Sequence, residues 1–222
     1  MIPRILLGSA SIPGGGELKL FRRGDEFSIM LGANELMNSR KKGSEESLAS
    51  LACAGLGSVK RPRVLIGGLG MGFTLRAALA ALPAAAEVVV AELVPGVVAW
   101  ARGEMAALYG GSLSDSRVQI VEEDVARTIR LGSWDAILLD VDNGPDGITV
   151  ESNDALYARP GLLAARASLK LGGVLAVWSS APDAAFTGRL RRAGFEVDEQ
   201  VVRGGSGGRG ARHVIWLARA PG

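Results

Sequence analysis

The fold of this chain is decided by the stretch Val64-Leu65-Ile66-Gly67-Gly68-Leu69-Gly70-Met71-Gly72, in which an apolar strand runs into a glycine turn. Glycine lets the backbone turn sharply and approach a ligand closely. The helix predicted over 73–82 would direct unpaired N–H groups and its positive dipole end at the turn. Glu92 follows about twenty residues later, the spacing at which a carboxylate binds ribose hydroxyls in nucleotide-binding βαβ units. The stretch predicts a nucleoside-type cofactor; the alternative is a βαβ unit whose glycines only aid packing.

Composition narrows the class of protein. A chain of 222 residues, 48% hydrophobic and 22% charged, fits one soluble domain with a small appendage. The net charge of +2 is too small to indicate a polyanionic partner. With one cysteine, Cys53, and one histidine, His213, we expect neither an internal disulfide nor a metal site. There is no run of apolar residues long enough for a membrane span and no signal-peptide pattern, so a cytoplasmic protein is expected.

Residues 1–42 are predicted to form a small antiparallel β appendage, and residues 43–222 the main domain. Glycine-containing turn signals separate short expected strands at 4–7, 18–22, 27–31 and 35–37. Ser44 followed by Glu45 and Glu46 has the pattern of a helix N-cap with acids in the first turn. We expect that helix to end at Gly55 and Gly57.

The main domain alternates strands with helices. Strands are expected at 63–66, 87–92, 118–121, 134–140, 174–179, 196–202 and 213–218, and helices at 73–82, 95–109, 126–131, 152–169 and 183–193. Gly172 and Gly173 are expected to cap the fourth of these helices. Such alternation predicts an α/β, Rossmann-like fold: a seven-stranded, mostly parallel sheet with helices on both faces. The last two strands are joined by a short connection and must form an antiparallel hairpin.

Polar residues gather where the predicted parallel strands end, which is where open α/β sheets bind ligands. Each acid has a structural alternative: Asp124 could belong to an exposed acidic run, Asp140 could cap a helix, and Asp142 could shape a turn. Four acids (Glu92, Asp124, Asp140 and Asp142) at consecutive strand ends nevertheless favour a cationic ligand. The candidates are Gly68, Gly70, Gly72, Glu92, Asp124, Asp140, Asp142, Asn143 and Trp178.

The order of glycine turn, Glu92, Asp124 and Asp140 resembles the class I S-adenosylmethionine-dependent transferases, and within them the spermidine synthase family. The resemblance extends to the β appendage, to Ala155-Leu156-Tyr157 and to the segment 169–175. It implies ribose on Glu92, the adenine amino group on Asp124, and Asp140 as the base or orienting group for an amine nucleophile. The resemblance also implies a homodimer. It implies that Tyr157 binds the substrate, although helix packing explains a tyrosine at this position equally well.

The chain departs from this family at the residues that recognise polyamines. Spermidine synthases carry an acid in the glycine turn that binds the amine of decarboxylated S-adenosylmethionine, and Gly70 stands at that position. The family's Tyr-His pair falls near Ser44-Glu45, its substrate glutamine near Glu35, and its second loop aspartate at Asn143 or Asp142. These departures favour a methyltransferase that uses ordinary S-adenosylmethionine.

Its acceptor is expected to be a small molecule such as an amine. Asp140 and then Asp142 are the expected catalytic residues, and Glu35, Asn143, Tyr157 and Trp178 the expected substrate-binding residues.

Two alternatives remain open. The first is an aminopropyltransferase that uses decarboxylated S-adenosylmethionine, with Asp142 or Glu35 in place of the missing acid. The second is a non-catalytic nucleic-acid-binding module, suggested by the arginines and glycines of 203–212. That segment lacks interleaved aromatic residues and fits a hairpin tip better, so no nucleic-acid partner is expected.

Overall fold

The main sheet, in a computed structural model that describes residues 2–141, 155–205 and 210–221, has seven strands in the spatial order β10-β11-β9-β8-β5-β6-β7. Neighbouring strands from β9 to β7 pair in parallel, whereas β11 is antiparallel to both β9 and β10. The predicted mostly parallel sheet with a C-terminal hairpin is therefore confirmed. The strands are β5 (Arg63–Gly67), β6 (Glu87–Ala91), β7 (Val118–Val121), β8 (Trp134–Leu139), β9 (Leu169–Ser179), β10 (Glu196–Arg203) and β11 (Arg212–Arg219).

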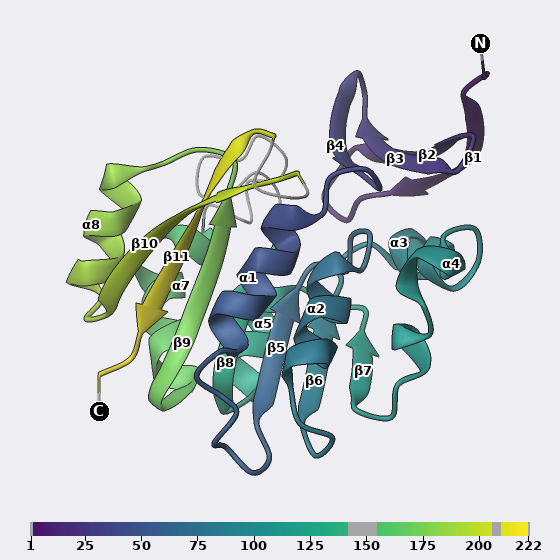
Figure 1. The fold of residues 1–222 in the computed structure, drawn as a ribbon. Helices are drawn as coiled ribbons and strands as arrows, with labels where there is room; N and C mark the ends of the chain where they lie inside the picture. Colours follow the sequence, from purple (N-terminus) through teal and green to yellow (C-terminus); the bar gives the residue numbers. More distant parts are fainter. Residues whose placement is uncertain (1, 142–154, 206–209, 222) are drawn as a thin grey trace.

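Helices cover both faces of this sheet, and the strand sequences explain why (Figure 1). Successive strand residues point to opposite faces, so Val64 and Ile66 join one hydrophobic cluster while Leu65 joins another. The first cluster includes residues of α1 (Gly43–Cys53), α2 (Phe73–Ala81), α3 (Pro95–Arg102) and α4 (Ala106–Tyr109). The second includes residues of α5 (Val125–Leu131), α7 (Arg159–Ser168) and α8 (Ala184–Arg192). None of the described helices combines the length and apolar character that a membrane span needs.

The appendage is a separate four-stranded antiparallel sheet in chain order: β1 (Ile5–Ser11), β2 (Glu17–Arg23), β3 (Glu26–Leu31) and β4 (Asn34–Asn38). It lies beside the end of the main sheet, above α3 and α4 in Figure 1. Leu20 and Ile29 are fully buried and share the hydrophobic cluster of α1 and α3. Because the two sheets share this core, the division at residue 42 stays a prediction.

Two of the predicted helices are shorter than expected. The helix predicted over 95–109 is interrupted at Gly103, whose backbone leaves the helical region (φ −107°, ψ −104°). The helix predicted over 152–169 begins only at Arg159, because Pro160 lacks an N–H and is tolerated only in a first turn. A short helical segment at 155–157 precedes it, and residues 142–154 lie outside the described part.

Two predicted caps are also wrong. Gly172 and Gly173 lie inside β9, which follows α7 directly and takes up the glycines at an irregularity in its pairing with β8. Ser44 lies inside α1 and Lys42 is the N-cap residue. The Ser44 hydroxyl instead donates a hydrogen bond to the Glu45 carboxylate at 2.6 Å.

Candidate functional site

The glycine turn between β5 and α2 is held from two sides. On one side, the Gly68 N–H donates to the carbonyl of Ala91 at the end of β6 (2.9 Å). On the other, the Tyr109 hydroxyl donates to the Gly70 carbonyl (2.7 Å). Gly72 has φ +79°, and a Cβ there would lie 2.4 Å from the Tyr109 ring, so only glycine fits. The turn thus has one fixed shape, set partly by α4.

Glu92 is buried directly beneath the turn, with 8% of its surface exposed. Its carboxylate accepts hydrogen bonds from the N–H groups of Leu69 and Val94, both at 2.9 Å. Burial raises the pKa of Glu92, and the backbone N–H groups oppose that shift. Each carboxylate oxygen has a second lone pair, so the group keeps acceptor capacity for a ligand hydroxyl.

Asp124 is the N-cap of α5, where its Oδ1 accepts a hydrogen bond from the Ala126 N–H at 2.7 Å. It is partly buried and lines a pocket with Glu92, so it is not simply part of an exposed acidic run. None of the hydrogen bonds found among the described residues uses its other oxygen, Oδ2. One side chain can therefore cap the helix and still face a ligand.

Asp140 stands at the end of β8, and its N–H donates to the Gly67 carbonyl at 3.0 Å. Its Oδ2 accepts a hydrogen bond from the Thr74 hydroxyl in the first turn of α2, at 2.5 Å. Burial raises the pKa of Asp140 to about 7, the charge of Glu45 adds to the rise, and the Thr74 hydrogen bond opposes it. A carboxyl with such a pKa exchanges protons near neutral pH, which suits a general base.

Two adjoining pockets meet at Asp140. They share Leu36, Met37, Gly70 and Asp140 as common wall residues. The first pocket is otherwise lined mainly by the ends of β5, β6 and β7, with Glu92, Leu93, Val94, Val97 and Asp124 among its residues. The second is lined mainly by α1, the glycine turn and the end of β9, with Glu45, Leu69, Met71, Gly72, Phe73 and Trp178 among its residues. Asp140 is the one acid that lines both pockets among the described residues.

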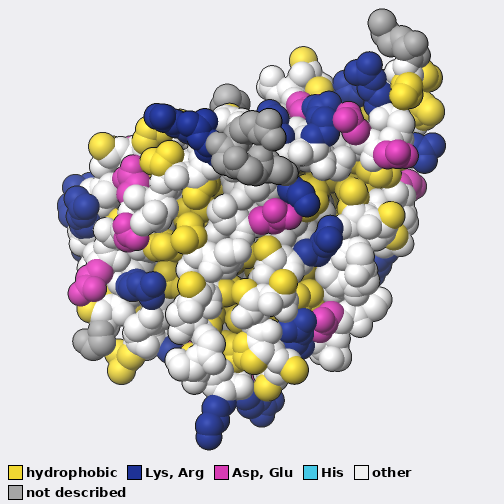
Figure 2. All heavy atoms as spheres, viewed as in Figure 1, with side chains coloured by type: hydrophobic (Ala, Val, Ile, Leu, Met, Phe, Trp, Pro, Cys, Tyr) yellow, Lys and Arg dark blue, Asp and Glu magenta, His cyan; other side chains and the backbone are white. Residues whose placement is uncertain are grey.

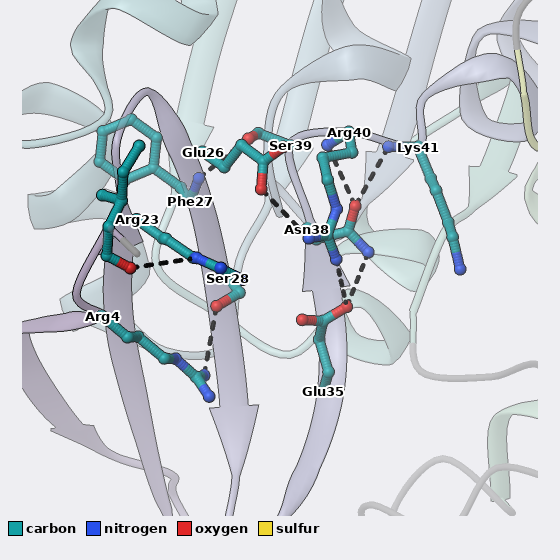
Figure 3. A network of polar contacts seen from close by, with 11 residues as sticks. Arg4, Arg23, Glu26, Phe27, Ser28, Glu35, Asn38, Ser39, Arg40 and Lys41 are labelled. Carbon is teal, nitrogen blue, oxygen red and sulfur yellow. Dashed lines mark hydrogen bonds and ion pairs between the residues drawn. The ribbon is translucent and has the colours of Figure 1, made fainter.

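The structure does not bring Glu35 into this group. Its carboxylate accepts a hydrogen bond from Asn38 at 2.9 Å and pairs with Arg40 at 3.4 Å, as Figure 3 shows. It lines a different pocket on the appendage, together with Arg4 and Glu26. Its substrate-binding role is therefore left without support from this geometry.

The two predicted aromatic residues have different surroundings. Tyr157 is 2% exposed and meets Phe186 edge-on, with ring centroids 5.6 Å apart in the second hydrophobic cluster. Trp178 lines the second pocket and stacks on His213, with centroids 5.0 Å apart. The predicted residues Asp142 and Asn143 lie outside the described residues.

Sequence reasoning missed three residues of this site: Glu45, Thr74 and Tyr109. Thr74 and Tyr109 bind Asp140 and the Gly70 carbonyl from 66 and 39 residues away, and no spacing pattern links such positions. Glu45 stood where the resembled family has its Tyr-His pair, and that departure was the one available signal.

The charges on the surface do not form a single basic patch on the face drawn in Figure 2, where Lys and Arg side chains are interspersed with Asp and Glu. Among the described residues, no group of three His, Cys, Asp or Glu side chains is arranged to hold a metal ion. The candidate site is therefore described by its acids and its apolar walls alone.

Comparison with known proteins finds similarity in structure only. No family model matches the chain, and no curated protein matches it in sequence. The spermidine synthase of Thermotoga maritima superposes with a TM-score of 0.73 at 19% identity, covering 97% of this chain and 72% of that one. A spermidine synthase structure in complex with the transition-state analogue AdoDATO gives the same values.

A probable spermidine synthase from Corynebacterium glutamicum gives a TM-score of 0.59 at 14% identity, covering 96% of this chain and 79% of that one. At such identities the likeness concerns the arrangement of the chain and not its chemistry. The protein therefore has the Rossmann-like fold of the spermidine synthases, including the β appendage.

Proposed function

We propose that this protein is a transferase of adenosyl-sulfonium donors, and that it moves an aminopropyl group from decarboxylated S-adenosylmethionine to an amine acceptor. The observation that carries the proposal is the position of Asp140 between two pockets, one lined by Glu92 and Asp124 and the other by Glu45. The fold likeness supports it, since a spermidine synthase of this fold has been solved with a transition-state analogue.

The residues of the first pocket fit an adenosyl group. Glu92 offers a fixed carboxylate for ribose hydroxyls, and Asp124 offers an acceptor for an amino group. Leu93, Val94 and Val97 supply apolar walls. An adenosyl group carries no phosphate, and this agrees with the acids Glu92 and Asp124 beside the glycine turn, because carboxylates would repel a phosphate.

The second pocket fits the reacting groups. A protonated amine acceptor would give a proton to the Asp140 carboxylate, whose pKa near 7 suits that exchange. The freed lone pair attacks the carbon bound to the sulfonium, so that a C–N bond forms as the C–S bond breaks. Neutral 5′-methylthioadenosine leaves, and the positive charge passes from sulfur to the new ammonium. The protein's part is to hold the reactants in line and to accept the proton.

Methyl transfer from ordinary S-adenosylmethionine is the second candidate. Gly70 favours it, because an acid is missing from the turn where an aminopropyl donor would need a charge partner. In that reaction the same pocket would hold the carboxylate-bearing tail of the donor, and the leaving product would be S-adenosylhomocysteine.

The leaving product decides between the two. The protein is incubated with either donor and a set of diamines, and the nucleosides formed are identified by mass spectrometry. We expect 5′-methylthioadenosine from the decarboxylated donor, at a rate that depends on both protein and diamine. S-Adenosylhomocysteine formed from ordinary S-adenosylmethionine would replace the first candidate by the second. Failure to form either product, with no nucleoside raising the melting temperature, would refute a donor site altogether.

A further inference from the structure

The second pocket is where the tail of a sulfonium donor has to lie. The two pockets adjoin, because Leu36, Met37, Gly70 and Asp140 line both. On the proposed function, an adenosyl group in the first pocket would direct its sulfur toward this shared lining. The chemistry of the second pocket therefore selects among donors that share an adenosyl group and differ in their tails.

Glu45 supplies charge to that pocket. It lies in the first turn of α1, and its carboxylate accepts a hydrogen bond from the Ser44 hydroxyl. No lysine or arginine of the described part pairs with Glu45 or with Asp140. Glu46, the next residue, pairs instead with Lys42 at 3.4 Å, with both side chains nearly half exposed. Burial raises the pKa of Glu45, and so does the charge of Glu46. The Ser44 hydrogen bond and the charge of Lys41 lower the pKa of Glu45, although Lys41 forms no ion pair with it within 4 Å.

Gly70 shows which position lacks an acid. A Cβ on Gly70 would touch only the Met37 sulfur, at 3.4 Å, and Met37 lines both pockets. A side chain at position 70 would thus lie against the lining that the two pockets share. Among the described residues, the acids that line the second pocket are Glu45, from α1, and Asp140, at the end of β8.

Resting on the proposed function, we propose that Glu45 is a specificity-determining residue: with Asp140 it binds the terminal ammonium of a sulfonium donor that has no carboxylate. Ordinary S-adenosylmethionine carries a carboxylate on the same tail. That group would stand near two carboxylates in a poorly solvated space, where like charges repel most strongly. Both donors carry an ammonium that Glu45 attracts, so the preference for the decarboxylated donor comes from repulsion of the carboxylate that only its competitor carries.

The test measures dissociation constants by titration calorimetry at pH 8 for three ligands: decarboxylated S-adenosylmethionine, S-adenosylmethionine and 5′-methylthioadenosine, which has no charged tail. The proteins are the wild type, Glu45→Gln and the matched control Glu46→Gln. Glu46→Gln removes the same charge from the same first turn of α1 but outside the pocket. We expect the wild type to prefer the decarboxylated donor about tenfold or more, and Glu45→Gln to lose about tenfold in affinity for it. 5′-Methylthioadenosine should bind all three proteins equally.

The outcomes separate the two claims. If Glu45→Gln binds the decarboxylated donor as tightly as the wild type does, or if the wild type prefers S-adenosylmethionine, the role of Glu45 is refuted while the adenosyl site stands. If 5′-methylthioadenosine does not bind the wild type, the proposed function itself fails. Glu45→Asp keeps the charge and should keep the preference. It also serves if Glu45→Gln does not fold, and a loss of preference in a folded Glu45→Asp that binds 5′-methylthioadenosine would equally overturn the inference.

Discussion

Replacing Asp140 by asparagine should make the ligand-free protein more stable at alkaline pH while removing its activity. The reason is that Asp140 is a carboxylate without a cationic partner among the described residues, in an environment that raises its pKa from 3.8 to about 7. Folding then costs free energy whenever the group is ionised. Asparagine has a similar shape, carries no charge, and can still accept a hydrogen bond from the Thr74 hydroxyl.

The size of the effect follows from the two pKa values. At 1.36 kcal/mol for each pH unit between 3.8 and about 7, ionised Asp140 costs about 4 kcal/mol. The pKa of about 7 already includes the opposing effect of the Thr74 hydrogen bond, so the expected gain for Asp140→Asn is about 4 kcal/mol. For a chain of this length that corresponds to a melting temperature about 8–16 °C higher.

The sign depends on pH. Between pH 4 and pH 7 the folded wild type keeps a proton on Asp140 that the unfolded chain has lost, so wild-type stability falls as the pH rises. The advantage of Asp140→Asn is therefore absent below about pH 4, grows up to about pH 7 and is constant above it. Urea denaturation of both proteins at several pH values measures this difference directly.

Asp124→Asn is the matched control, because it removes a charge at the same edge of the sheet, after β7, where the side chain caps α5. Asparagine caps helices as well as aspartate does, so its stability should stay within about 0.5 kcal/mol of the wild type. If Asp140→Asn proves less stable than the wild type at pH 8.5, or if its advantage does not grow with pH, Asp140 is not a desolvated acid and its assignment as the base loses its physical basis.

Further predictions concern the glycine turn and the binding of ligand. Glu92→Gln places an amide N–H opposite one of the two backbone N–H groups that now donate to the carboxylate. We expect the free energy of unfolding, measured by urea denaturation, to fall by about 1–3 kcal/mol, and 5′-methylthioadenosine to bind at least tenfold more weakly. Gly72→Ala should cost about 2 kcal/mol or more, because its Cβ meets the Tyr109 ring at 2.4 Å, whereas Gly172→Ala, with φ +73° and no atom within 4 Å, should cost about 1–2 kcal/mol from backbone strain alone. Equal losses would refute the clash. Affinity for a sulfonium donor should rise between pH 5.5 and about 7 as Asp140 ionises, then level off; a calorimetric profile equally steep in Asp140→Asn would contradict this.

The main sheet could be predicted from sequence because each strand carries its own signal. Runs such as Val64-Leu65-Ile66 are apolar on both faces, and the alternation with helices leaves few arrangements. The misplaced boundaries lie where two local signals competed. Gly172 and Gly173 resemble a helix cap, yet pairing of β9 with β8 extends the strand through them. Hydrogen bonding across the sheet decides this, and no local pattern reports it.

The site was predictable only in so far as it lies at strand ends. Glu92, Asp124 and Asp140 follow parallel strands, whose carboxyl ends share one edge, so their proximity follows from topology. Glu45 and Tyr109 come from helices, and their side chains reach the turn because α1 and α4 pack against the same hydrophobic cluster. That packing depends on contacts between distant parts of the chain. Glu35 is the opposite case: the family resemblance predicted that it binds the substrate, but in the structure it pairs with Arg40 on the appendage.

The acids of this site destabilise the free protein for the same reason that they suit a cationic ligand. Burial raises the pKa of both Asp140 and Glu45, and each lacks a described lysine or arginine as a pairing partner. A carboxylate in such surroundings gains more from a cation than it would in water, because little solvent competes for it. A sulfonium donor with an ammonium tail brings two positive charges to this place. Stability and ligand binding are therefore opposed at this site. A variant that gains stability by losing the charge of Asp140 or Glu45 also loses the carboxylate that would distinguish decarboxylated S-adenosylmethionine from ordinary S-adenosylmethionine.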